Sequence, residues 1–229
     1  MILDTIATVS DKRRYDDPCG IARGLNVIGE RWALLVVREL LFGPKRFTDL
    51  RHGLPTASQN VLSQRLRELE TGGVVRRRRL GPPAATWVYE LTEWGRGLEP
   101  VLFHLGRWGS RSPRTSGNEL STDALMLALR TSFDADAARD GTWELRLGDD
   151  RFRAVVADGR LRLERGGADE PDAVLVTDVA TLRSVAFGDR ALDEAAADGA
   201  LRVEGDEEAA ARFAASLRRP APLEPAETR

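Results

Sequence analysis

The feature that most constrains the fold is a segment at residues 56–72, whose apolar side chains recur with the period of an α-helix. Those apolar residues are Val61, Leu62, Leu66 and Leu69. Their spacing predicts one buried stripe along an amphipathic helix. Thr56 or Ser58 can cap the start of this helix, and the Gly72-Gly73 pair can end it. The rest of its surface carries mostly amide, hydroxyl and guanidinium groups.

This polar helix face has two interpretations. An α-helix fits the major groove of DNA, where such groups can hydrogen-bond base edges. An ordinary solvated helix face has the same composition. The preceding segments favour the first interpretation: residues 31–42 predict a buried helix, and residues 46–54 predict a short helix that ends before Pro55. Two helices, a tight break and a polar-faced helix form a helix-turn-helix pattern.

A β-hairpin is predicted next, with strands at residues 74–80 and 86–91 joined through Gly81-Pro82-Pro83. Its position directly after the polar-faced helix makes it a wing. Four consecutive arginines lie on its first strand, and because side chains alternate along a strand, about two of them can face a phosphate backbone. The predicted DNA-contacting residues are Arg46, Thr56, Ser58, Gln59, Asn60, Ser63, Gln64, Arg65, Arg67, Arg76, Arg77, Arg78 and Arg79. Those expected to read bases are Ser58, Gln59, Asn60, Gln64 and Arg65.

The second half of the chain predicts a different architecture. Residues 113–118 lie in a polar stretch with Pro and Gly that is typical of a linker, and a helix is predicted at residues 119–133. Strands are predicted at 142–147, 151–157, 160–164, 173–177 and 201–204, and helices at 178–186, 189–197 and 207–217. The chain is therefore of the α+β class, with domains at residues 1–112 and 119–218 and a disordered tail at 219–229.

Charge is divided between the two halves. Residues 1–114 hold 19 Lys and Arg against 12 Asp and Glu, whereas residues 115–229 hold 15 against 24. This asymmetry predicts a basic half that meets a polyanion and an acidic half that does not. The near-exclusive use of arginine indicates a GC-rich coding bias, which lowers the weight of any arginine run. Coding bias does not explain why the positive charge gathers in one half.

Composition argues against several other classes of protein. No apolar run approaches the ~18 residues of a membrane helix, and residues 1–10 lack the features of a secretion signal. A single cysteine cannot form an internal disulfide, so a cytoplasmic location is expected. His52 and His104 have no metal-ligand spacing nearby, and no phosphate loop or serine-nucleophile elbow is present. We therefore expect no enzyme activity, no metal site and no cofactor.

Residues 18–109 resemble the HxlR family of winged-helix transcription regulators, relatives of the MarR group. The matching segments are CGIARGLNVIGERW, RELLFGPKRFTDLRHGLP, LSQRLRELETGGVVRR and GPPAATWVYELTEWGRGLEPVL, followed by Trp108-Gly109. One departure is Glu30-Arg31-Trp32, where the family commonly has Gly-Lys-Trp, although a basic residue is kept. The resemblance implies a homodimer joined through its terminal helices. Such a dimer implies an operator that is an inverted repeat of double-stranded DNA.

Residues 119–218 resemble a sterol-carrier-protein-like domain, through the segments WELRLGDDRFRAVVADGRLRL, DAVLVTDVATLRSVAFGD and DGALRVEGDEEAAARF. Similar domains have a five-stranded sheet with helices against one face, and many enclose an apolar tunnel for a lipid-like ligand. This resemblance implies a small apolar or amphipathic ligand that modulates DNA binding. The large apolar residues suited to line such a site are Trp143, Phe152, Leu182 and Phe187. The simpler alternative is that these residues fill the core.

Cys19 adds another hypothesis, because in several members of the HxlR family a cysteine here senses oxidants or electrophiles. A helix start after Pro18 can favour a reactive thiolate, whereas Asp16 and Asp17 place opposing negative charge nearby. The alternative is a small apolar residue at the dimer interface. Two hypotheses thus stand beside the ligand-modulated regulator. One is a redox-sensing regulator with the second domain as a spacer, and the other is a ligand carrier or dimerisation module without DNA binding.

Overall fold

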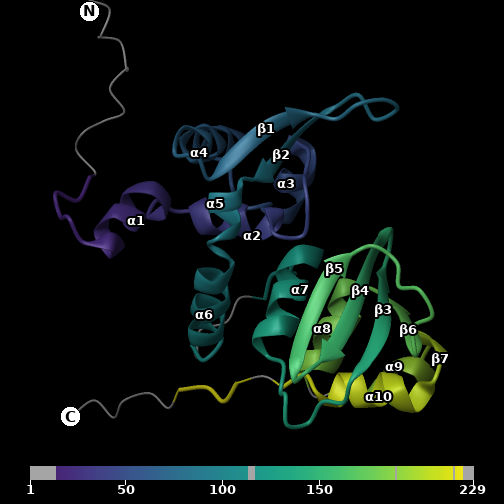
Figure 1. Cartoon of the computed structure of the whole chain (residues 1–229). Coiled ribbons are helices and arrows are strands. Elements are labelled where there is room, and N and C mark those ends of the chain that lie inside the picture. Colours follow the sequence, from purple (N-terminus) through teal and green to yellow (C-terminus); the bar gives the residue numbers. More distant parts are fainter. Residues whose placement is uncertain (1–13, 113–116, 189, 219, 224–229) are drawn as a thin grey trace, which may run out of the picture.

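The computed structural model describes residues 14–112, 117–188, 190–218 and 220–223, which form two packed units (Figure 1). The first unit is a winged helix-turn-helix, and the second is built on a five-stranded sheet. The α+β class predicted from the sequence is therefore confirmed. Within the described ranges, no helix has the length and apolar character needed to cross a membrane.

The first unit is organised around α4 (Gln59–Thr71), whose leucines are buried as their spacing predicts. They pack into one cluster with α2 (Ala33–Leu40) and with the start of the wing. The remaining helices are α1 (Gly20–Ile28), α3 (Phe47–Gly53), α5 (Glu93–Arg96) and α6 (Glu99–Gly109). The wing is the antiparallel pair of β1 (Val75–Arg79) and β2 (Trp87–Leu91). It lies beside α4 and projects away from the helices (Figure 1).

After Thr92 the chain forms two successive helices, α5 and α6. Thr92 caps α5, because its Oγ1 accepts a hydrogen bond from the backbone N–H of Gly95 (3.0 Å). Gly95 lies so close to the residue before β1 that a Cβ placed on it would be 2.1 Å from the carbonyl oxygen of Val74. Pro100, which has no N–H, stands in the first turn of α6, where no donor is required. The glycine-rich segment and this proline together turn the chain between the two helices.

The second unit contains a sheet with the strand order β5-β4-β3-β6-β7. The strands are β3 (Gly141–Leu147), β4 (Asp150–Ala157), β5 (Arg160–Arg165), β6 (Ala173–Thr177) and β7 (Arg202–Gly205). Neighbouring strands are antiparallel except β3 and β6, which are parallel. The helices are α7 (Thr122–Thr131), α8 (Val179–Phe187), α9 (Leu192–Ala197) and α10 (Glu207–Ala215). Helices α8 and α10 pack against one face of the sheet, in the predicted layout (Figure 1).

Helix α7 packs against both units. Its Leu127 belongs to the buried cluster of the first unit, whereas Leu125 and Leu129 belong to that of the second. Phe42, which follows α2, contacts both clusters and meets Phe152 edge-to-face, with ring centroids 5.7 Å apart. The interface between the units is therefore continuous with both cores. The domain limits drawn from the sequence stay predictions.

Three parts of the chain named in the sequence predictions lie wholly or partly outside the described residues. They are the first 13 residues, the middle of the predicted linker (113–116) and most of the predicted tail (219 and 224–229). Residues 220–223 are described and have no regular secondary structure. The backbone N–H of Leu223 donates to the carbonyl oxygen of Arg111 (2.9 Å).

Replacing Gly95 with alanine should destabilise the protein, because the added methyl group meets the backbone carbonyl of Val74. Overpacking of this kind typically costs about 1–3 kcal/mol. Gly81→Ala is the matched control, since nothing lies within 4 Å of a Cβ at that position. Urea unfolding measures the free energy of unfolding of both variants. A G95A protein as stable as the wild type would contradict the close approach described above.

Candidate nucleic-acid interface

The start of α4 is fixed by a side-chain cap. The Ser58 Oγ accepts a hydrogen bond from the backbone N–H of Val61 (3.4 Å), so the hydroxyl satisfies one of the unpaired donors of the first turn. Thr56 is exposed in the turn that precedes the helix. The cap predicted at Ser58 is therefore present, and it orients the first turn of α4 outward.

The outward face of α4 presents hydrogen-bonding side chains. Its exposed members are Gln59, Asn60, Gln64 and Arg67, and Ser63 is half-buried. The Gln64 Nε2 donates to the Glu68 Oε1 (2.9 Å), which holds this amide along the helix. An amide side chain both donates and accepts hydrogen bonds, as base edges do. This face thus retains the chemistry that the sequence predicted for it.

Arg65 departs from the prediction that it reads bases. It is only 7% exposed, its Nη1 forms an ion pair with Glu68, and its Nη2 lies 3.6 Å from Glu30. The reason is helical geometry, because Arg65 lies three residues after Leu62 and four before Leu69, at the edge of the buried stripe. In this structure the Arg65 guanidinium group is therefore held by carboxylates instead of lying free on the outward face of α4.

The four wing arginines fall into two pairs, as alternation along a strand predicts. Arg76 and Arg78 reach Glu90 on β2, with nitrogen–oxygen distances of 2.7 and 2.8 Å. The Arg77 guanidinium carbon lies 4.5 Å from the centre of the Trp87 ring, a cation–π contact. Arg79 is exposed and, among the described residues, has no ion-pair partner.

Glu90 is the residue of the wing that sequence reasoning missed. Its carboxylate is buried beneath the two arginine side chains. The hydrogen bond from Arg78 holds the pKa of the Glu90 carboxyl below its ordinary value, although burial opposes this shift. The signal that could have found it is the strand register, which sets Arg76 directly opposite Glu90. Glu90 thus fixes two of the four guanidinium groups on one face of the wing.

Arg46 completes the predicted basic surface. It is exposed at the start of α3, where its backbone N–H donates to the Asp49 Oδ2 (2.9 Å). Its guanidinium group has no acidic partner in the described part of the chain. Arg46 therefore adds one more exposed positive charge at the helix-turn-helix.

Two helices of the first unit, α1 and α6, each carry exposed large apolar side chains. They are Ile21 and Leu25 on α1, and Val101, Leu105 and Trp108 on α6. Ile21 is 76% exposed and Trp108 is 72% exposed. Large apolar side chains this exposed are typical of an interaction surface.

Cys19 lies at the start of α1, two residues before the exposed Ile21. It is exposed, and its Sγ is 3.4 Å from the backbone nitrogen of Ala22. Its own N–H donates to the Asp17 Oδ1 (2.8 Å), which places a carboxylate beside it. The helix start and the opposing negative charge named in the sequence analysis are thus both present.

The four residues predicted to line a ligand site lie in or against the core of the second unit. Trp143 stacks on Phe213, with ring centroids 4.9 Å apart, and donates a hydrogen bond to the carbonyl oxygen of Ala209. Phe152 and Leu182 are buried, and Phe187 is half-buried against the same cluster. The second unit also has a surface groove, and none of these four residues lines it.

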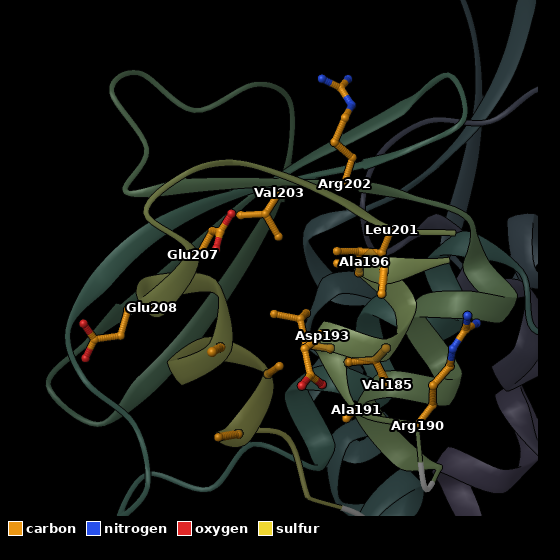
Figure 2. A pocket seen from close by; sticks show the side chains of 15 residues that line it. Val185, Arg190, Ala191, Asp193, Ala196, Leu201, Arg202, Val203, Glu207 and Glu208 are labelled. Atoms are coloured by element: carbon orange, nitrogen blue, oxygen red, sulfur yellow. The ribbon is translucent and has the colours of Figure 1, made fainter. Parts of the chain in front are cut away.

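That groove lies between α8, α9, β7 and α10 and has a volume of about 960 Å³ (Figure 2). Its floor is apolar and includes Val185, Leu201 and Val203. Charged residues line it as well, and they are Arg190, Asp193, Arg202, Glu207 and Glu208. An apolar floor with a charged rim suits an amphipathic molecule. In the described ranges, no group of three His, Cys, Asp or Glu side chains is placed to hold a metal ion.

Comparison with known proteins matches each half of the chain to a different family. Residues 27–116 match the model of the HxlR-like helix-turn-helix family. Residues 112–223 match the model described as the alkyl sulfatase C-terminal domain. The second match names a more specific family than the sterol-carrier-like resemblance drawn from the sequence.

Individual relatives match the first half. The HTH-type transcriptional regulator YdeP of Bacillus subtilis is 39% identical over 95 residues, which cover 41% of this chain and 73% of YdeP. The reduced form of the B. subtilis regulator YodB is 33% identical, covers 41% of this chain and 92% of that one, and has a TM-score of 0.37. The redox regulator HypR in its oxidised form is 35% identical, covers 42% of this chain and all of that one, and has a TM-score of 0.39. Because residues 27–116 match the HxlR-like model and the chain is 39% identical to YdeP over 73% of that protein, the chain belongs to the HxlR-like family of transcriptional regulators.

Proposed function

We propose that this HxlR-type regulator binds double-stranded DNA with α4 in the major groove and the wing along the phosphate backbone. The observation that carries the proposal is the face of α4, which presents Asn60 and Gln64 to solvent above a fully buried leucine stripe. The groups proposed to read bases are those of Ser58, Gln59, Asn60, Gln64 and Arg67. Arg65 is left out of this set because its guanidinium group is buried.

The remaining basic and hydroxyl groups are proposed to contact phosphates. Arg46 and Arg79 are exposed without acidic partners among the described residues, and Arg77 extends over Trp87. Contacts of this kind fix the orientation of a protein on the duplex without carrying sequence information. Thr56 before α4 and Ser63 within it are proposed to contact phosphates as well. A regulator of transcription acts where the chromosome lies, which supports the cytoplasmic location expected from the sequence.

We further propose a homodimer joined through the exposed apolar residues of α1 and α6. Covering Ile21 and Trp108 with a second copy would remove large apolar side chains from water, which is favourable. A two-fold dimer presents two recognition helices about 34 Å apart, so the operator is an inverted repeat with half-sites about one helical turn apart.

We propose that the second unit binds a small amphipathic molecule in the groove between α8 and α10. The apolar floor and charged rim support this placement over the four core residues named from the sequence, whose side chains already fill the interior. A bound molecule shifts DNA affinity only by its different affinity for the free and DNA-bound states. The named relatives are regulators, and we propose no enzyme activity for this chain.

Redox sensing through Cys19 is the alternative mode of control. The exposure of its thiol at the start of α1 favours it, since oxidation requires access. Modification there would act directly on the proposed dimer surface. In that alternative the second unit serves as a spacer.

Asn60→Ala and Gln64→Ala should each weaken binding to a duplex that the wild-type protein selects from random DNA. A bidentate base contact is worth about 1–3 kcal/mol, whereas affinity for an unselected duplex should change little. Thr71→Ala is the control, because Thr71 is exposed at the far end of the same helix. Fluorescence anisotropy measures the dissociation constant of each of the four proteins, the wild type included, on both duplexes. Equal losses on both duplexes would reassign these residues to phosphate contacts.

Charged residues on α6 should disrupt the dimer. The double variant Leu105→Glu, Trp108→Glu is expected to sediment as a monomer at micromolar concentration and to protect one half-site. Trp94→Glu, also at an exposed tryptophan but on α5, is expected to stay dimeric. Analytical ultracentrifugation and footprinting give both readouts. A wild-type protein that is monomeric and protects one asymmetric site would contradict the dimer.

Filling the groove should abolish retention of a small molecule. Native mass spectrometry of the purified protein should detect a bound species that is lost in Ala211→Trp, since Ala211 lines the groove. Ala180→Trp, at an exposed position of α8 outside the groove, is the control. The released molecule should change DNA affinity by about 1–3 kcal/mol of coupling. If no species is retained and no extract fraction alters DNA binding, the ligand hypothesis fails and the second unit is better described as a spacer.

A further inference from the structure

A chain of four ionic groups, two of them buried carboxylates, runs across the interface between the two units. Glu39 on α2 is fully buried, and Asp123 in the first turn of α7 is 2% exposed. Lys45, in the loop between α2 and α3, lies between them, with its Nζ 2.9 Å from the Glu39 Oε2 and 2.5 Å from the Asp123 Oδ2. Arg165, at the end of β5, donates from Nη2 to both carboxylate oxygens of Asp123 (3.0 Å each).

Lys45 also holds the wing. Its backbone N–H donates to the carbonyl oxygen of Tyr89 (3.0 Å), and its carbonyl oxygen accepts from the Tyr89 N–H (2.8 Å). These two hydrogen bonds form one antiparallel bridge between Lys45 and Tyr89, so Lys45 adds to the hairpin beside β2. The backbone of Lys45 therefore sets the position of β2, while its side chain ends on Asp123.

Glu39 connects the same chain of charges to the helix-turn-helix. Its Oε1 accepts from the Ser121 Oγ (2.6 Å), at the cap of α7, and from the Arg38 guanidinium group. Gly53, the last residue of α3, lies against its carboxylate, and a Cβ placed there would be 2.1 Å from the Glu39 Oε2. Any movement of this carboxylate therefore reaches the turn between α3 and α4.

Arg165 is the last member of this ionic chain, and the sheet of the second unit determines its position. Arg165 also pairs with Asp150 at the start of β4, and its guanidinium carbon lies 4.5 Å from the centre of the Phe152 ring. Phe152 meets Phe42 from the first unit edge-to-face. The position of Asp123 thus depends on how the edge of the sheet, β4 and β5, is placed.

We propose that Asp123 and Arg165 of the second unit are positioning residues for DNA binding. Through Lys45 and Glu39 they hold the wing strand β2 and the α3–α4 turn in the arrangement that meets DNA. The inference rests on the proposed function, because it takes α4 and the wing as the DNA surface. It assigns to the second unit a direct physical effect on DNA affinity, whatever molecule occupies its groove.

The test compares Asp123→Asn with Asp123→Glu in the full-length protein. The asparagine keeps the shape of the side chain and removes the charge that faces Lys45 and Arg165, and the glutamate keeps that charge. Phe213→Leu is the stability control, because Phe213 is buried in the second unit against Trp143 and is not a member of the ionic chain. All measurements are made at a temperature at which every variant is folded by circular dichroism.

The first readout is affinity for the duplex selected by the wild-type protein. D123N should bind it at least tenfold more weakly, D123E should recover most of this loss, and F213L should bind within twofold of the wild type. The second readout is hydrogen exchange without DNA. The segments that contain Lys45 and Tyr89 should exchange at least tenfold faster in D123N, and α2 should not.

Two results would overturn the proposal. One is D123N binding within twofold of the wild type. The other is an F213L variant that lowers the melting temperature as much as D123N does and also weakens DNA binding as much as D123N does. If the wild-type protein selects no duplex, the proposed function fails, and hydrogen exchange alone decides the positioning role. Unchanged exchange at Lys45 and Tyr89 in D123N would then reject it.

Discussion

The structure depends on burying two carboxylates where its two units meet. Placing Glu39 and Asp123 out of water costs roughly several kcal/mol for each ion unless hydrogen bonds and opposite charges compensate. The geometry supplies both, because each carboxylate accepts from at least two donors and Lys45 lies between the two. Removing one partner would leave the others buried and uncompensated. The units are therefore fixed in one relative arrangement, in a way that apolar packing alone does not enforce.

Apolar packing at the same interface explains why the two units do not form separate bodies. Leu127 of α7 completes the core of the first unit, and Phe42 joins both clusters. A helix that belongs to the second unit by sequence thus supports α2 and, through it, α4. Deleting the second unit would expose this surface to water, so point substitutions are the cleaner way to separate its regulatory role from its structural one.

The helix α4 and the wing could be predicted because periodicity and turn residues act locally. Leucines at helical spacing and a Gly-Pro-Pro connection determine those elements without knowledge of their partners. The spacing of Arg65 from Leu62 and Leu69 places it at the edge of the buried stripe, but its ion pair with Glu30 could not be predicted because Glu30 lies in another segment. Glu39 looks from sequence like a polar break in an apolar helix, because its partner Ser121 is 82 residues away in the chain. The break between α5 and α6 likewise follows from contact between Gly95 and Val74.

The arrangement of arginines separates coding bias from function. In the second unit most of the described arginines pair with carboxylates, as in Arg153 with Glu164 and Arg212 with Glu208, although Arg160 and Arg183 do not. At the helix-turn-helix and wing, Arg46, Arg67 and Arg79 are exposed, and no acidic side chain of the described residues pairs with them. A coding bias raises the number of arginines in both units but does not by itself place unpaired ones at the helix-turn-helix and the wing. Unpaired positive charge on the surface of α4 and the wing is what a phosphate backbone requires, since each contact it makes releases a bound counterion.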